Sequence, residues 1–335
     1  MADHALFRLN FPAILYLTQW KIDSINLLMS KILGGFPIYK SNTPQKNGNT
    51  IADSAKVASP TPTPPLEARL FVFDDGFVYA ASAVTSSQTS RHAGVILISL
   101  DDTSVQVSLA KSKYGERDEL SGRVIALAPS VSRSVNVGSG GALSIHFGPS
   151  HPMYFPMAQC LANKGGIAIS PKYFSNMKNE LQKCKHDADE GTVRKVFESC
   201  AHVIAEFCPQ PFSRDRRIVK LLENMQSQSP LDYKFSDILS RFDLSASRFS
   251  HLFTANAGLS LRSFLQWQKI KEAIAMFETG ASMTEIAHAS GFSDSAHFCR
   301  TFNKCLGLKP SMFGPGRAVN VQVLDKNQEN EYIYA

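Results

Sequence analysis

Residues 282–302 read SMTEIAHASGFSDSAHFCRTF, and they carry clear secondary-structure signals for the last third of the chain. Ser282 and Glu285 stand three residues apart, which is the spacing of a capping box at the start of a helix. Gly291 follows this short helix and supplies the backbone freedom that a tight turn needs. The stretch therefore predicts a short helix, a turn and a second helix.

The second helix of this stretch is expected from Asp294 to about Leu306. We expect Ser293 to cap it, because a serine side chain can accept a hydrogen bond from the free backbone amides of the first turn. Phe298 and Phe302 are four residues apart, so they share one helical face, which we expect to be buried. The opposite face is then free to contact another molecule.

The same design occurs once before, in residues 235–257, which read FSDILSRFDLSASRFSHLFTANA. A short helix is expected to end in a tight turn at Leu244, and Ser245 is expected to cap a second helix from Ala246 to about Ala257. The inward faces of these two helices are apolar, with Ile238, Leu239 and Phe242 on the first and Phe249, Leu252 and Phe253 on the second.

A helix, a turn and a capped second helix make up a helix-turn-helix, whose second helix lies in the DNA major groove. One match is weak, because any helical hairpin can produce it. Here two matches are joined by an amphipathic helix, residues 261 to about 278, which can hold them about one DNA turn apart. Residues 212–318 also carry 14 Lys and Arg against 9 Asp and Glu, whereas residues 67–211 carry 14 of each. We therefore expect residues 212–318 to have a self-contained core and to bind DNA alone.

The outward faces of the two second helices must carry the groups that reach the base edges. By helical phase and position these groups are Ser247, Arg248, Ser250 and His251 in the first unit, and Ser295, His297, Cys299 and Arg300 in the second. Arg300 is the strongest candidate, since a guanidinium can donate two hydrogen bonds to guanine. In the alternative interpretation, Arg300 pairs only with a phosphate or with Asp294.

Taken together, these residues resemble the DNA-binding domain of the AraC family of bacterial regulators, over residues 212–317. The matching motifs are Leu244-Ser-x-x-x-Phe-x-x-Leu-Phe253, Gly258, Trp267-x-Lys-Ile-x-x-Ala273, Ile286-Ala-x-x-x-Gly-Phe-Ser293, His297-Phe-x-Arg-x-Phe302, Gly307 and Pro310. One departure is Lys269, where the family usually has arginine. The lysine keeps the charge but loses the bidentate fork. The resemblance implies that the eight outward residues contact DNA.

Residues 67–156 have a different periodicity, with apolar residues at every second position, as in Val105–Ala110. Turn signals such as Asp101-Asp102 separate these segments at the spacing of an antiparallel sandwich or barrel. The continuous apolar run Val95–Ile98 predicts a strand that is covered on both faces. The expected fold class is therefore α+β, with an N-terminal antiparallel β-barrel and a C-terminal all-α domain.

This middle domain resembles the cupin-like sensor domain of the same regulators, through Arg91-His-Ala93 and Ala128-Pro-Ser-Val-Ser-Arg133. Related regulators often carry paired histidines at these places, but here Gly94 and Arg133 occupy two of the positions. A metal cupin needs about three histidines and a carboxylate around one cavity, so we predict no metal and no cofactor.

The candidate effector-binding residues are His92, Arg133 and His146, with His151 as a fourth polar residue of the same kind. They have two interpretations: they line a ligand pocket, or they are ordinary polar residues at the rim of the barrel. No spacing rule singles them out, and this favours the rim.

Residues 157–211 are expected to be helical and to serve dimerisation or linking, because apolar residues recur at three- and four-residue spacing from Val193 to Phe207. This apolar stripe could pack on its own domain or form a dimer seam.

Residues 1–66 are expected to be a poorly ordered extension and linker, since residues 41–66 are rich in Pro, Thr, Ser and Asn. Residues 319–335 are expected to be a flexible tail. The short apolar run at residues 11–17 lacks a cleavage site, so we expect no secretion signal, and no run reaches the roughly 20 residues of a membrane span. The six cysteines form no CxxC pair, which favours reduced, buried thiols in the cytoplasm.

No catalytic motif occurs in the chain, so we predict that it is not an enzyme, and a cupin-type metal enzyme is the least favoured alternative. The favoured function is a cytoplasmic, activator-type transcription regulator of the AraC type that responds to a small molecule through its barrel, with the sign of regulation left open. A sensorless regulator whose barrel only dimerises remains the alternative. The expected partners are double-stranded DNA, RNA polymerase, a small-molecule effector and a second copy of the chain, with no membrane.

Overall fold

The computed structural model describes residues 68–110, 117–208, 213–226 and 229–324, all within one compact unit. The extension and linker expected for residues 1–66 lie outside the described residues. None of the described helices has the length and apolar character needed to cross a bilayer.

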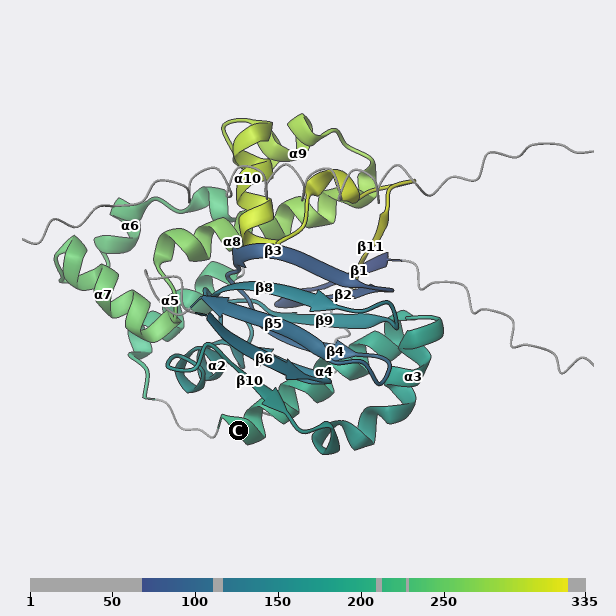
Figure 1. Ribbon diagram of the computed structural model, residues 1–335. Helices are drawn as coiled ribbons and strands as arrows, with labels where there is room; N and C mark the ends of the chain where they lie inside the picture. The colour runs from purple at the N-terminus through teal and green to yellow at the C-terminus, as the bar shows by residue number, and fades with distance from the viewer. Residues whose placement is uncertain (1–67, 111–116, 209–212, 227–228, 325–335) are drawn as a thin grey trace, which may run out of the picture. The chain divides into compact units, whose positions relative to one another are not determined.

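The strands of the described residues form two sheets (Figure 1), a larger one in the order β10-β7-β4-β9-β2-β1-β11 and a smaller one in the order β3-β8-β5-β6. The fold class is confirmed, although these strands form two separate sheets and not one closed barrel. The bounds are β1 Ala68–Phe73, β2 Gly76–Ala81, β3 Val84–Ser90, β4 Gly94–Ser99, β5 Val105–Ala110, β6 Arg117–Gly122, β7 Val124–Leu127, β8 Ser132–Val137, β9 Ala142–Phe147, β10 Gly166–Ile169 and β11 Val319–Val323.

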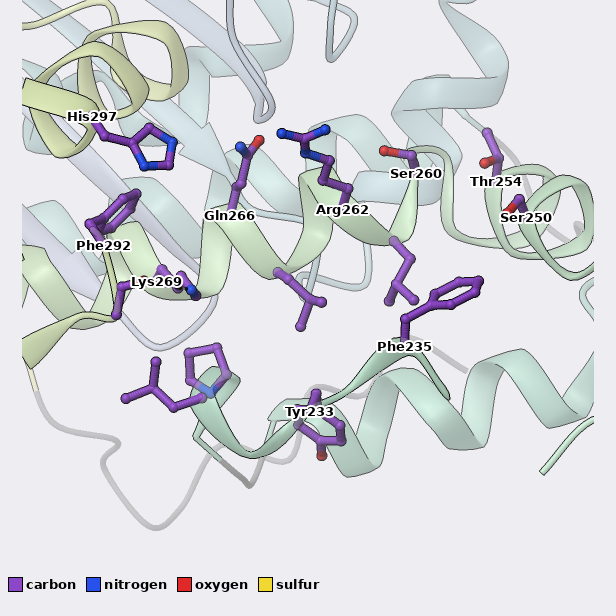
Figure 2. A pocket seen from close by; sticks show the side chains of 15 residues that line it. Tyr233, Phe235, Ser250, Thr254, Ser260, Arg262, Gln266, Lys269, Phe292 and His297 are labelled. Atoms are coloured by element: carbon purple, nitrogen blue, oxygen red, sulfur yellow. Dashed lines mark hydrogen bonds between the residues drawn. The ribbon is translucent and has the colours of Figure 1, made fainter. Parts of the chain in front are cut away.

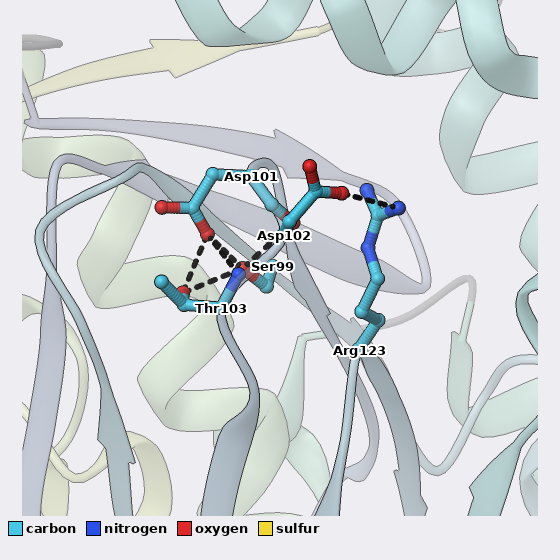
Figure 3. A network of polar contacts seen from close by, with 5 residues as sticks. All are labelled: Ser99, Asp101, Asp102, Thr103 and Arg123. Atoms are coloured by element: carbon cyan, nitrogen blue, oxygen red, sulfur yellow. Dashed lines mark hydrogen bonds and ion pairs between the residues drawn. The ribbon is translucent and has the colours of Figure 1, made fainter.

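The turn between β4 and β5 is held by local hydrogen bonds (Figure 3). The carboxylate of Asp101 accepts one bond from the hydroxyl of Ser99 at 2.7 Å and another from the backbone amide of Thr103 at 2.9 Å. Arg123 adds an ion pair to Asp102 at 3.1 Å. The turn that the sequence predicts at Asp101-Asp102 is therefore confirmed.

The central strands of the larger sheet, β2, β4, β7 and β9, are buried along their whole length, as the run Val95–Ile98 predicts for β4. One face packs against α4, Glu190–Phe207, whose Val196 and Phe197 join the core of the sheet. The ring of Phe197 stacks on Phe73 with centroids 4.4 Å apart. The apolar stripe of this helix thus packs on its own domain, and its interpretation as a dimer seam is wrong.

The other face of the larger sheet packs against the smaller sheet and against two helices from the end of the chain, α8 (Leu261–Ala275) and α10 (Ser295–Leu306). The ring of Trp267 in α8 lies 5.9 Å from Phe77 in β2, and α10 contacts β3. Since the last helices share one core with the sheets, the expectation that residues 212–318 have a self-contained core is wrong.

All six cysteines are free thiols. Four of them are buried, as expected, whereas Cys160 and Cys299 are only half-buried. The remaining helices are α2 Tyr154–Cys160, α3 Lys178–His186, α5 Arg216–Gln226, α6 Phe235–Leu239, α7 Ala246–Ala257 and α9 Met283–Ala289, with 3-10 helices η1 Pro171–Met177, η2 Pro230–Asp232, η3 Met276–Thr279 and η4 Pro310–Met312.

Two segment boundaries differ from those expected. The strand β10 lies inside the segment expected to be helical and pairs with β7. The strand β11 lies where a flexible tail was expected and pairs in parallel with β1, from Ala68 opposite Val319 to Val72 opposite Val323. Its Val321 is buried in the core that α8 and α10 share with the sheets. The larger sheet therefore contains strands from both ends of the described chain.

Candidate DNA-binding interface

The first helix-turn-helix unit consists of α6 and α7. The hydroxyl of Ser245 accepts a hydrogen bond from the backbone amide of Arg248 at 3.4 Å, which confirms the predicted cap. Gly258 ends α7 with a left-handed φ of 79°. Phe249 and Phe253 are fully buried, as predicted, in a core that α5 completes. This core fixes which face of α7 points to solvent.

The second unit consists of α9 and α10, and the predicted capping box is present. The backbone amide of Ser282 donates to the carboxylate of Glu285 at 2.8 Å, and the amide of Glu285 donates to the hydroxyl of Ser282 at 3.2 Å. Gly291 takes a φ of 72° in the turn, a conformation that residues with a Cβ adopt only at a cost. Phe298 and Phe302 are fully buried, as predicted.

The cap of α10 is Asp294, so the prediction of Ser293 is wrong. The carboxylate of Asp294 accepts a hydrogen bond from the backbone amide of His297 at 2.7 Å, while the hydroxyl of Ser293 donates to that carboxylate at 2.9 Å. A carboxylate is the stronger acceptor, and a negative charge is favoured at a helix N-terminus. The amide of His297 also lowers the pKa of Asp294.

The helix α8 joins the two units, and its 15 residues span about 22 Å at the usual helical rise. The ammonium group of Lys269 donates to the carbonyl oxygen of Gly291 at 2.8 Å and lies 5.8 Å from the centre of the Phe292 ring. Lys269 is the position that departs from the family pattern. Here it holds the turn of the second unit against α8.

The predicted DNA contacts are more exposed in α7 than in α10. All four residues predicted in α7 are exposed: Ser247, Arg248, Ser250 and His251. In α10, Arg300 is exposed, whereas Ser295, His297 and Cys299 are half-buried. The ring of His297 packs edge-on against Phe292 with centroids 5.4 Å apart, and Cys299 packs against the core of the second unit. Arg300 is therefore the most accessible of the four residues predicted in α10.

Arg300 borders a surface hollow of about 480 Å³ that Asn303 and Lys309 also line. Within the described part of the chain, no ion pair joins Arg300 to Asp294. This geometry leaves the guanidinium available to a base or to a phosphate, and it weakens the alternative in which Arg300 pairs with Asp294.

A groove of about 520 Å³ runs along α8 between the two units (Figure 2). Arg262 and Gln266 project from one side of α8, with Thr254 of α7 near one end and His297 of α10 near the other. Arg262 and Gln266 are not among the contacts predicted from the sequence, although their four-residue spacing on an amphipathic helix marks them as neighbours on one face. This groove brings residues of both units to one surface.

The candidate effector-binding residues and their neighbour Arg91 lie in the interior of the N-terminal domain, so the favoured interpretation that the candidates sit at the rim of the barrel is wrong. The exposed fractions are 3% for Arg91, 5% for His92, 0% for Arg133, 2% for His146 and 3% for His151. Burial lowers the pKa of His92 to about 4, so this ring is neutral at pH 7.

Arg91 stands beside His92 in the predicted motif, but it was not among the predicted effector-binding residues. The ring of His151 lies at the contact between the larger sheet and α4, where it packs on Phe147 and on Phe197 of α4. Among the described residues, no group of three or more His, Cys, Asp or Glu side chains could hold a metal ion.

Residues 238–314 match a helix-turn-helix domain family. The chain is 31% identical over 109 residues to the arabinose operon regulatory protein of Salmonella typhimurium, covering 32% of this chain and 38% of that protein. It is 37% identical over 81 residues to the HTH-type transcriptional regulator YfiF of Bacillus subtilis, covering 24% and 26% of the two chains. The C-terminal region is an AraC-type helix-turn-helix domain.

The matches to this AraC-type domain span less than half the length of either curated relative. Among solved structures, ToxT from Vibrio cholerae O395 aligns with 70% of this chain and 94% of its own, at 16% identity and a TM-score of 0.42.

Proposed function

We propose that this protein is a sequence-specific transcription regulator that reads double-stranded DNA with α7 and α10. One observation carries the proposal: α8 joins two capped helices, and each of them carries an exposed arginine on its outward side, Arg248 on α7 and Arg300 on α10. Two recognition helices placed about one DNA turn apart can enter successive major grooves on one side of the duplex.

Arg248 and Arg300 are the proposed cationic contacts, one in each recognition helix, and the other six outward residues are the proposed polar contacts around them. Arg262 lines the groove between the units and is placed to meet the phosphates that lie between two successive major grooves. Phosphate contacts fix the register of the protein on DNA, while contacts to base edges select the sequence.

The test is selection of binding sites from a random duplex library by the full chain. We expect an enriched element with two short conserved blocks whose centres are about one helical turn, or 10 base pairs, apart. The double variant Arg248→Ala/Arg300→Ala should lose this enrichment, whereas Lys195→Ala, which removes an exposed charge on α4, should retain it. Absence of any enriched sequence with the unmodified chain would refute the proposal.

The regulator would act in the cytoplasm, with RNA polymerase and a second copy of the chain as further proposed partners. The stripe of α4 is covered by its own sheet, so a dimer would have to use another surface. We also propose that the N-terminal domain binds a small-molecule effector. The support for this is a set of buried polar atoms on Thr89, Arg91, Arg133 and His146 that have no partner among the described residues, which a platform used only for dimerisation does not need.

A further inference from the structure

The interior of the N-terminal domain contains two arginines with unmet hydrogen-bonding capacity. Arg133 on β8 is fully buried, and its Nη1 atom donates to the carbonyl oxygens of Ala128 at 3.1 Å and Val131 at 3.4 Å. Its Nε and Nη2 atoms and the Nε atom of Arg91 are buried and have no partner in the described part of the chain. Within the described residues, neither guanidinium has an acidic side chain at ion-pair distance.

The residues around these arginines add donors and no negative charge. Thr89 lies directly opposite Arg133 across the β3–β8 pair, and its buried hydroxyl has no partner among the residues that the structure describes. The imidazole of His146 shares one hydrogen bond with Ser144 at 2.7 Å, and its Nδ1 atom has no partner within the same residues. Burial lowers the pKa of this ring, and the positive charges of Arg91 and Arg133 lower it further.

Two buried guanidinium groups without a counter-ion lower the stability of the fold. A guanidinium remains charged at pH 7 even when its pKa falls to about 10, as burial does for Arg91. An unpaired buried charge is strongly destabilising, and two like charges close together add to the cost. An oxyanion between them would satisfy the free N–H groups with charge-assisted hydrogen bonds, for which the guanidinium fork is well shaped.

Arg91 also lies against the second recognition helix, α10. Gly307 is the left-handed C-cap of α10, and the guanidinium of Arg91 lies so close that a Cβ built on Gly307 would stand 2.5 Å from its Nε atom. A cation at a helix C-terminus is favoured by the helix dipole. An anion bound beside Arg91 would neutralise this charge and weaken the attachment of α10 to the N-terminal domain.

We propose that the N-terminal domain binds a small oxyanion, the carboxylate of an organic acid or a phosphate, between Arg91 and Arg133, and that its binding is transmitted through Gly307 to α10. The inference rests on the proposed function, since it names the class of effector and its route to the DNA-binding helix. Thr89 and His146 would complete the site. Both kinds of ligand present several acceptor oxygens around one atom, in a plane in a carboxylate and in a tetrahedron in a phosphate.

The test measures thermal unfolding of the full chain with sodium phosphate, acetate or benzoate, each at fixed pH and with ionic strength matched by sodium chloride. We expect at least one of these anions to raise the Tm by several degrees, and Arg133→Met to abolish the rise. Arg123→Met removes an arginine that already has the partner Asp102, and it should keep the rise. A phosphate response and a carboxylate response distinguish the two sources.

Arg91→Met provides a second variant if Arg133→Met does not fold, and it should also remove the response. If no anion raises the Tm of the unmodified chain above the chloride control, the proposed site is refuted. A rise in the Tm of Arg91→Met and Arg133→Met that equals the rise in the unmodified chain refutes the site as well.

The effect on DNA binding separates this proposal from the proposed function. In the unmodified chain, the stabilising anion should change affinity for the selected DNA element by at least about fivefold, the lower end of usual allosteric coupling. In Arg133→Met, specific DNA binding should persist without this response. Stabilisation by the anion in a chain that selects no DNA sequence would refute the proposed function alone. Stabilisation with unchanged DNA affinity would refute the transmission through Gly307.

Discussion

The two helix-turn-helix units differ in what buries their cores. The first unit packs mainly on its own helices, with Phe249 and Phe253 against α5 and the start of α8. The second unit shares a continuous core with the two sheets, and β11 ties the chain beyond it to β1. The first unit thus meets the N-terminal domain through α2, whose Tyr154 joins its core and lies beside Gly258, whereas the second unit shares its core with the sheets themselves. A signal from the sheets therefore has a direct route to DNA through α10.

The largest expected effect tests this difference in anchoring. Truncating Phe298 to Ala should lower the free energy of unfolding by about 3–5 kcal/mol, because it leaves a cavity in the core shared by α10 and the sheets. Phe249→Ala should cost a similar amount but loosen mainly the first unit. Urea unfolding gives the totals, and amide hydrogen exchange shows where protection is lost. If Phe298→Ala leaves the exchange of the sheets unchanged, the shared core is refuted.

The next effect concerns the turn of the second unit. Lys269→Met should destabilise the chain by about 1.5–3 kcal/mol, since it removes a charged hydrogen bond to the carbonyl oxygen of Gly291. Lys269→Arg should restore most of this stability, because a guanidinium can donate to the same oxygen. Arg262→Ala, an exposed position on the same helix, should change stability by less than about 0.5 kcal/mol and serves as the control.

The comparison of the two recognition helices depends on how each arginine contacts DNA. If Arg300 reads a base, Arg300→Ala should relax preference at one or two adjacent positions of the site, a loss of about 1–3 kcal/mol of discrimination. If it contacts only phosphate, binding to all sequences should weaken together and the salt slope should fall by about one unit.

The same measurements on Arg248→Ala show whether the first unit reads DNA in the same way. Binding constants for the selected element, its single-base variants and random DNA at several salt concentrations distinguish the outcomes. Uniform weakening by Arg300→Ala would exclude base reading by Arg300 and leave the helix-turn-helix assignment unchanged.

The smallest expected effect concerns the cap of α10. Asp294→Ala should lower the Tm by a few degrees at pH 7, whereas Ser293→Ala should have a smaller effect, because Asp294 accepts the backbone hydrogen bond. The pKa of Asp294 is lower in the folded chain than in the unfolded chain, where it is about 3.9. The contribution of this carboxylate to stability is therefore present in full above the unfolded pKa and is lost as the pH falls through the folded pKa. The Tm difference between Asp294→Ala and the unmodified chain should therefore disappear in acid. A larger effect of Ser293→Ala would restore the cap that the sequence predicts.

The features of the interface that depend on neighbours within about one helical turn could be predicted from the amino-acid pattern. The capping box of Ser282 and Glu285, the cap at Ser245 and the buried faces of α7 and α10 all follow from spacings of three and four residues. The backbone hydrogen bonds and side-chain contacts that fix them join residues close in the chain, so the pattern contains their cause. The alternation of β5 and the full burial of β4 were predictable for the same reason.

The long-range contacts of the exposed and polar residues could not be predicted in this way, because they depend on how the folded chain packs. The tertiary structure placed β11 beside β1, although 245 residues of chain lie between Phe73 and Val319, and it turned the stripe of α4 onto the sheet. It also brought Arg91 against Gly307 and left Arg133 without a counter-ion. Such pairings depend on the packing of elements distant in sequence, and a local period of two or of 3.6 residues carries no information about which distant partner a face will find.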